Sequence, residues 1–410
     1  MDMDQFDNAL RPIDGGGVTS PAGFRAAALP AGIRPGSTAS DLAILLVDEA
    51  APVSAVFTKS AFDAAPVRVS RANLAAGDGT ARAVVMNGVS ANAATGEQGL
   101  ACARETVEIA AQILGCETAQ VLVASAGAIG EPLDIEPFDT TLPALIDAAS
   151  PDGGPLIAQA LAVPGARPRE CAISYASKTL AYAGCTFTVG GLCMGEGPFA
   201  LLTTDAPVCA RTLGRIFEEV VGRTFAKVLV DPDRAVSGVS LMLASGAAGA
   251  DAPEIAPGTE EAEELAYVVG QVAETLARQV AADGAGASKL LTVRVAGAVS
   301  DEDADAAARA VGTSSLVRAQ VAGRVCEAGA VLAALGRSGA AFDQESAAVS
   351  MMGIPVCEAG VALPVDAAEA ARRFEAGEIE IAIDLGAGEA STTVWGSDLT
   401  AAYVEQAARR

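Results

Sequence analysis

The sequence predicts an α+β protein with two lobes, and three observations support that fold class. The chain has 410 residues, 51% of them hydrophobic, so it can bury a core too large for one small domain. Short runs of branched apolar residues mix with helical patterns, without the strict βαβ repetition of a doubly wound sheet. Pro and Gly gather at 247–258. We therefore expect a lobe of residues 1–246 and a smaller one of residues 247–410.

The expected elements of the first lobe follow from apolar runs bounded by Gly, Pro or Asn. A helix over 100–114 should end at Gly115, after a loop rich in Gly and Asn at 87–99. Residues 150–170 carry several Pro and Gly and are expected to form a surface connection. The remaining expectations are strands at 41–47, 55–58, 82–87, 121–124, 227–230 and 240–244, paired strands within 174–189, and a helix over 211–221.

The second lobe should begin with a long amphipathic helix over 260–282. Ser300 and the acids after it indicate a helix start, where the dipole favours negative charge, rather than a metal site. Strands are expected at 289–295, 378–385 and 392–395, with a closing helix from Thr400.

Composition excludes several classes of function. Lys and Arg number 27 against 51 Asp and Glu, giving a net charge of −24, which argues against nucleic-acid or anionic-membrane partners. The first ten residues are acidic, so we expect no secretory signal there, and no run of 18 apolar residues predicts a membrane span. Eight scattered cysteines without a Cys-x-x-Cys pair indicate reduced, buried thiols and no metal site. We expect a cytoplasmic protein.

The chain contains no histidine. Nucleophile activation by Ser-His-Asp or Cys-His, and histidine-ligated zinc, are therefore excluded. Any catalysis has to use carboxylates, lysines, hydroxyls, thiols, backbone amides or a free α-amine.

Residues 190–206 (GGLCMGEGPFALLTTDA) read as a glycine turn that enters a buried strand and leaves through a Thr-Thr-Asp turn. The segment 284–289 (GAGASK) superficially matches a phosphate loop. It lacks the full spacing and precedes a strand instead of a helix, so a nucleotide site is disfavoured.

Many segments, taken in order, resemble the ornithine acetyltransferase family, the bifunctional glutamate/ornithine N-acetyltransferases of the cyclic arginine pathway. The resemblance runs from Gly17 to about Val404. The matching segments include VTSPAGFRAA (18–27), VFTKSAFDAAPV (56–67), VLVASAGAIGEPL (121–133), TVGGLCMGEG (188–197), ASKLLTVRVAGAVSDEDA (287–304) and WGSDLTAAYV (395–404).

The resemblance implies a fold similar to that of N-terminal-nucleophile enzymes, which is a layered α/β sandwich. It also implies that the protein forms a homo-oligomer. Family members cut themselves before a threonine in a pattern like K-G-S-G-M-I-x-P-N-M-A-T-M-L. The freed threonine attacks the acetyl donor with its own α-amine as base, which needs no histidine. The implied substrate is a small amino acid, with N-acetylornithine or acetyl-CoA as acetyl donor and no bound cofactor.

Carried over residue by residue, the family's functional groups are mostly replaced. The oxyanion turn S-T-G reads Ser125-Ala126-Gly127, which leaves the Gly127 amide as its only donor. The lysine position is Met194, and Gly195-Glu196-Gly197-Pro198 leads into the strand without the P-N-M-A-T block. The substrate-binding glutamate falls on Ala285 and the C-terminal Asn on Ala407, and the last residue is Arg410.

Three interpretations remain open. A working acetyltransferase would need Thr203 or Thr204 as a substitute nucleophile, although TTDA (203–206) also occurs in the family as a turn after a strand. A non-catalytic member, in effect a pseudoenzyme, would act as a partner subunit or a ligand-binding regulator. Different acyl chemistry would use Cys193, Glu196 or Asp205. The loss of several pocket groups together predicts weak or absent acetyltransferase activity.

Overall fold

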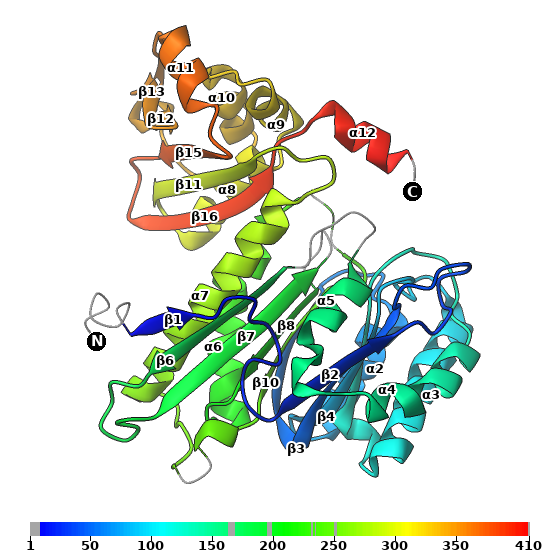
Figure 1. The fold of residues 1–410 in the computed structure, drawn as a ribbon. Helices are drawn as coiled ribbons and strands as arrows, with labels where there is room; N and C mark the ends of the chain where they lie inside the picture. Colours follow the sequence, from blue (N-terminus) through cyan, green and yellow to red (C-terminus); the bar gives the residue numbers. More distant parts are fainter. Residues whose placement is uncertain are drawn as a thin grey trace. The chain divides into compact units, whose positions relative to one another are not determined.

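The computed structural model describes residues 9–162, 169–194, 199–230, 233, 235–249 and 252–408. The chain forms two compact units, one of residues 1–226 and 234–276 and the other of 227–233 and 277–410 (Figure 1). The division falls within one continuous helix, α7 (Glu260–Ala282), and not in the Pro/Gly-rich segment at 247–258. That segment lies within the first unit because Ile255 bridges to Val208.

The first unit is built on one mixed sheet in the order β1-β6-β7-β8-β10-β3-β4-β5, with β2 also pairing with β3. Its strands are β1 (Leu10–Pro12), β2 (Phe24–Leu29), β3 (Leu42–Phe57), β4 (Thr80–Asn87), β5 (Val121–Ser125), β6 (Glu170–Ala176), β7 (Thr186–Met194), β8 (Phe199–Thr204) and β10 (Val239–Ala244). Its other helices are α2 (Ala65–Ala76), α3 (Gly96–Leu114), α4 (Glu136–Asp147), α5 (Gly154–Leu161) and α6 (Ala210–Arg223).

Alternation along β3 to β5 divides the core of this unit into two layers. Leu42, Ile44 and Val85 face α2, α3 and α4 on one side of the sheet. Leu45 and Met86 face α5 on the other side, together with Leu192 and Leu201 of β7 and β8. Apolar side chains on alternate positions are therefore covered on both faces.

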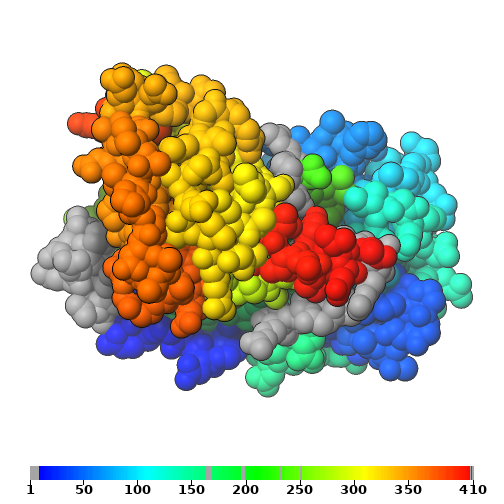
Figure 2. All heavy atoms as spheres, turned by 90° about the horizontal axis from the view of Figure 1, so that it is seen from above, coloured from blue at the N-terminus to red at the C-terminus, as the bar shows by residue number. Residues whose placement is uncertain are grey.

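The second unit has a seven-stranded sheet in the order β14-β13-β12-β15-β11-β16-β9. Its strands are β9 (Val228–Leu229), β11 (Leu290–Ala298), β12 (Ala348–Met351), β13 (Ile354–Glu358), β14 (Val361–Ala362), β15 (Glu378–Asp384) and β16 (Ala390–Ser397). Its helices are α8 (Asp301–Gly312), α9 (Ser315–Ala322), α10 (Ala328–Gly336), α11 (Ala367–Arg373) and α12 (Ala401–Ala407). Residues 300–340 (yellow) and 345–375 (orange) are neighbours on one face of this unit in Figure 2.

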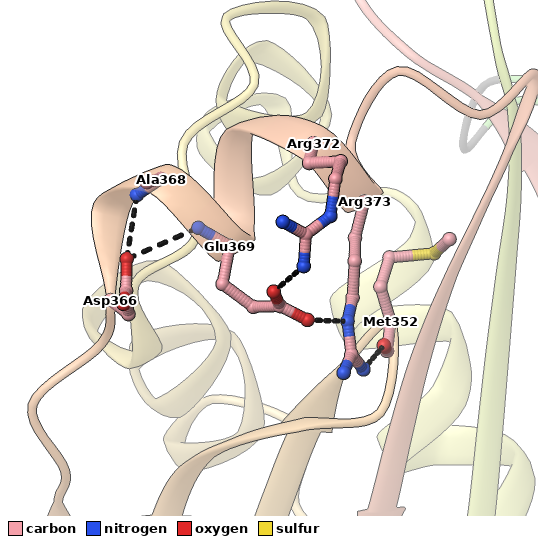
Figure 3. Close-up of polar contacts among 6 residues, drawn as sticks. All are labelled: Met352, Asp366, Ala368, Glu369, Arg372 and Arg373. Carbon is pink, nitrogen blue, oxygen red and sulfur yellow. Dashed lines mark hydrogen bonds and ion pairs between the residues drawn. The ribbon is translucent and has the colours of Figure 1, made fainter.

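Helix α11 shows how short elements of this unit are fixed (Figure 3). Asp366 caps it by accepting from the Ala368 and Glu369 amides at 2.8 and 3.1 Å. Glu369 pairs with Arg372 and Arg373, and Arg373 donates to the Met352 carbonyl at 2.8 Å. These contacts attach α11 to the tight turn between β12 and β13.

The mixed fold of sheets and helices predicted from the sequence is confirmed. Four local features differ from the expectations. Segments 41–47 and 55–58 belong to the single strand β3, helix α2 was not expected, and the supposed surface connection at 150–170 contains α5. The glycines at 190 and 191 lie inside β7 and not in a turn.

Candidate functional site

The turn after β5 carries the one expected donor that survives, the Gly127 amide. The turn runs beside residues 87–91, because Ala126 and Ala128 donate to the carbonyls of Asn87 and Val89, both at 3.0 Å. The intervening Gly127 amide has no partner within the described part of the chain, and the residue is exposed. A free, exposed N–H on a fixed turn can donate to a ligand oxygen.

Gly127 is required by the backbone. Its φ is +134°, and a Cβ placed on it would lie 2.0 Å from the carbonyl oxygen of Val89. No side chain fits there without moving the turn away from the neighbouring loop.

Asn87, at the end of β4, anchors this turn. Its Nδ2 donates to Ser125 Oγ at 2.6 Å, and its Oδ1 accepts from the amides of Val89 and Ser90, each at 3.1 Å. Asn87 and Ser125 are both buried. An amide donating to Ser125 Oγ makes that oxygen less nucleophilic, so Ser125 supports the turn and does not act as a nucleophile.

The ends of β7 and β8 lie against the same turn. Met194 and Phe199 are opposite each other across this antiparallel pair, and both are buried. The gap between these side chains and the turn is too narrow to admit a water molecule, since the volume open to one is about 0 Å³. It is lined by Met86, Asn87, Ala124, Ser125, Ala126, Leu161, Met194 and Phe199.

The structure therefore brings together two positions that the family resemblance assigned to the site, Ala126 and Met194. Both now carry apolar side chains. A second small space, of about 20 Å³, adjoins Asn87 and Ser125 on the α3 side of the sheet, where Thr106 and Phe138 also line it. It has room for about one water molecule.

Thr203 does not lie in this space. It is the fifth residue of β8, fully buried, and it pairs with Gly190 of β7 and Leu243 of β10. Its Oγ1 donates to the Val18 carbonyl at 2.8 Å. A threonine whose peptide bonds lie between two neighbouring strands has no free α-amine and no access to substrate. Thr204 likewise donates to Thr188, at 2.9 Å.

Replacing Thr203 with Val is expected to reduce stability and to leave catalysis unaffected. Thr203→Val leaves the buried Val18 carbonyl without its hydroxyl partner, which should cost about 1–2 kcal/mol of unfolding free energy. Hydrogen exchange of the β7 and β8 amides measures that loss. If Thr203→Val removed an acetyl-transfer activity that the unmodified chain possesses, the structural role assigned here would be wrong.

The other candidate groups near the junction are structural or undescribed. Burial raises the pKa of the Cys193 thiol to about 12, so it is a poor nucleophile. Asp205 accepts from the amides of Thr188 and Ala22 at 2.7 and 3.1 Å, and its pKa is raised because it is buried. Residues 195–198, including Glu196, lie outside the described residues.

The remaining positions implied by the resemblance belong to the second unit. Ala285 lies partly buried in the loop between α7 and β11. Ala407 ends α12, but its side chain lies outside the described residues, as does Arg410. In the GAGASK segment, Asp398 accepts from the Ser288 and Lys289 amides, and Lys289 donates to the Ala376 carbonyl at 2.6 Å. These contacts give that segment a structural role.

The described residues meet neither the requirements of a metal site nor those of a membrane-spanning helix. They contain no group of three or more Cys, Asp or Glu that could hold a metal ion. Among their helices, none combines the length and apolar character needed to cross a membrane.

The fold and the site together define a class of protein. Its members have an α+β fold with two sheets, and a glycine turn lies beside the end of an antiparallel strand pair. The sequence model of the ArgJ family matches residues 25–409. The chain belongs to the ArgJ family.

Similar proteins carry the name "Arginine biosynthesis bifunctional protein ArgJ". That of Symbiobacterium thermophilum is 38% identical, over 95% of this chain and 97% of that protein. That of Thermus thermophilus is 37% identical, over 94% of this chain and 97% of that protein. Two solved structures match about half of this chain each.

The first solved structure is ArgJ of Bacillus halodurans, 28% identical, which covers 51% of this chain and 98% of its own with a TM-score of 0.49. The second is ornithine acetyltransferase of Mycobacterium tuberculosis complexed with ornithine, which is 31% identical. It covers 47% of this chain and 99% of its own, with a TM-score of 0.41.

Proposed function

We propose that this chain is a non-catalytic ArgJ-family protein, which neither cuts itself nor transfers acetyl groups, and which serves as a partner subunit of an active member. The observation that carries the proposal is the closure of the space beside the Ser125–Gly127 turn by Met194 and Phe199.

The chemistry of the replaced groups supports loss of activity. A covalent mechanism needs a nucleophile, and the first hydroxyl after Met194 in the sequence is Thr203, in the middle of a paired strand. Losing an oxyanion donor costs about 10²–10³ in rate, whereas losing the nucleophile removes the mechanism. Among the described residues that line the space, the polar side chains are Asn87 and Ser125, which bind each other. An amino-acid substrate would bury its charged groups there without partners, at high cost.

The same geometry favours a partner subunit over a small-molecule regulator. A ligand-binding regulator needs a cavity, and the space at this turn does not hold even a water molecule. The scaffold around it is intact, with fixed turns and a well-packed core. We therefore expect this chain to associate with other copies or with a self-cleaving relative, in the cytoplasm.

The second candidate is the acetyltransferase activity that the relatives' printed name and the family resemblance suggest. The free Gly127 amide favours it, because an oxyanion donor is retained without another evident role. This candidate requires a nucleophile other than Thr203 and Thr204, and the residues outside those described include no Ser, Thr or Cys.

The experiment that separates the two candidates is acetyl transfer from N-acetylornithine or acetyl-CoA to glutamate. The Symbiobacterium relative serves as the active control, and rescue of an arginine auxotroph is scored in parallel. We expect no transfer and no rescue by this chain alone, and co-purification with an active family member. Rescue at the level of the control would refute the proposal.

A further inference from the structure

Glu170, the first residue of β6, has an unusual carboxyl group. Its Oε1 is buried and has no hydrogen-bond partner within the described residues. Burial raises the pKa of this carboxyl to about 7 from an ordinary value of 4.5. At neutral pH the group is therefore close to its titration midpoint.

Residues 13–20, which we name the glycine strap, cover this carboxyl. Oε1 occupies the place that a side chain on Gly17 would take, and a Cβ on Gly16 would lie 2.7 Å from Ala172 Cβ. Gly190 likewise lacks a side chain where the Gly17 carbonyl comes close. Small residues on both sides thus allow the strap to lie directly on β6 and β7.

The face beneath the strap is apolar apart from Glu170 and Thr203. Glu170 pairs with Leu192, and Leu192 pairs with Leu201, so the three side chains share one face of the sheet. Thr203, on the same face, holds the strap through its hydrogen bond to the Val18 carbonyl. The Ile13 amide holds it too, by donating to the Ala172 carbonyl of β6 at 2.9 Å. Glu170 is a further polar group between strap and sheet, and its Oε1 makes no such bond.

No described element provides a compensating charge. Cys171 lies on the opposite face, where it contacts Thr275 of α7. Arg169 lies on that face too, because its charge acts on the Cys193 thiol there. Helix α5 and the facing positions of β7 and β8 carry no titratable side chain. The strap itself brings Asp14 and the adjoining β1 brings Arg11. Among the described residues neither contributes to the raised pKa of Glu170, which comes from burial.

We propose that Glu170 is a proton-operated latch for the glycine strap: the protonated carboxyl keeps residues 13–20 packed on the sheet, and the ionised carboxylate opens them to water. The sign follows from linkage. The packed state holds the proton more tightly than the open state, in which the carboxyl regains its ordinary pKa. Packing is therefore most stable below the ordinary value of 4.5 and is progressively lost as pH rises through about 7. This inference does not depend on the proposed function.

Hydrogen exchange of the full chain, followed by mass spectrometry from pH 5 to 8, tests the latch. The strap amides of Ile13, Gly16, Gly17 and Ser20 are hydrogen-bonded in the packed state and report its opening. After correction for base catalysis, strap opening should increase by about tenfold between pH 6 and pH 8. In Glu170→Gln, which has the same size but cannot ionise, we expect no such increase.

Two controls keep the result interpretable. Glu49→Gln removes an exposed carboxyl from β3 of the same unit and should behave like the unmodified chain. Glu170→Met tests whether an apolar side chain of similar length also abolishes the pH dependence, as the latch requires. The same pH dependence in Glu170→Gln as in the unmodified chain would overturn the proposal. So would an increase shared by the Val123 amide of β5, because that would indicate opening of the whole unit.

Discussion

Gly127→Ala should cost the first unit about 3–4 kcal/mol of unfolding free energy. The new Cβ would meet the Val89 carbonyl oxygen, and L-residues adopt this φ of +134° only with strain. To relieve the clash, the turn has to give up the hydrogen bonds between Ala128 and the loop at 89–91. Strain of about 1–2 kcal/mol and two lost hydrogen bonds of about 1 kcal/mol each give the expected total.

A glycine three residues further on is the matched control. Gly130 also has a positive φ, +84°, but a Cβ there would have no neighbour within 4 Å. Gly130→Ala should therefore cost only the backbone strain, about 1 kcal/mol. Hydrogen exchange of the β4 and β5 amides measures both variants within the first unit. Equal losses in the two variants would show that the close approach to Val89 has no energetic importance.

Ser70→Ala is the second substitution with a large expected effect. Strand β5 is the last strand of its sheet, and Ser70 of α2 takes the place of the missing neighbour. Its hydroxyl donates to the Val123 carbonyl at 2.6 Å and accepts from the Val123 amide at 2.8 Å. Both groups would be left buried and unpaired in Ser70→Ala, at a cost of about 1–3 kcal/mol each. We expect a total loss of about 3 kcal/mol.

Ser37→Ala is the control for loss of a serine hydroxyl. Ser37 accepts from the Ala39 amide in an exposed turn, where water can replace it. Its replacement should change the unfolding free energy by less than about 0.5 kcal/mol. A loss in Ser70→Ala no larger than in Ser37→Ala would mean that water reaches the edge of β5, and that α2 does not seal it.

Much of the fold could be predicted because local pattern and tertiary structure agree. The helix over 100–114 ends at Gly115 in a left-handed conformation, as expected, although α3 begins earlier, at Gly96. Ser300 caps α8 through the Asp303 amide. The strand expected after the glycine cluster is β8.

Other elements depend on contacts that no local pattern reveals. Separate strands were expected at 41–47 and 55–58, yet β3 is continuous because β4 pairs with it on both sides of a bulge between Leu46 and Ala51. Helix α2 has only weak amphipathic patterning and is held by Ser70 and Asn73 on β5. Tertiary packing decided both cases.

The candidate site was predictable only in part. The family resemblance implied neighbouring positions at Ala126 and Met194, and both line one space. The anchoring role of Asn87 was missed, although an Asn-Gly pair at the end of a strand was a usable signal. Glu170 gave no signal, because its character comes from a strap more than 150 residues earlier in the chain.

The intact mass of the purified full-length protein tests the central claim most directly. If the junction after Met194 no longer supports self-cleavage, one polypeptide of about 40.8 kDa should be present, and it should remain uncut during prolonged incubation. The self-cleaving activity that the family resemblance implies should appear in the Symbiobacterium relative, treated in parallel, as two chains. Two fragments of this protein, divided between residues 194 and 203, would contradict the account.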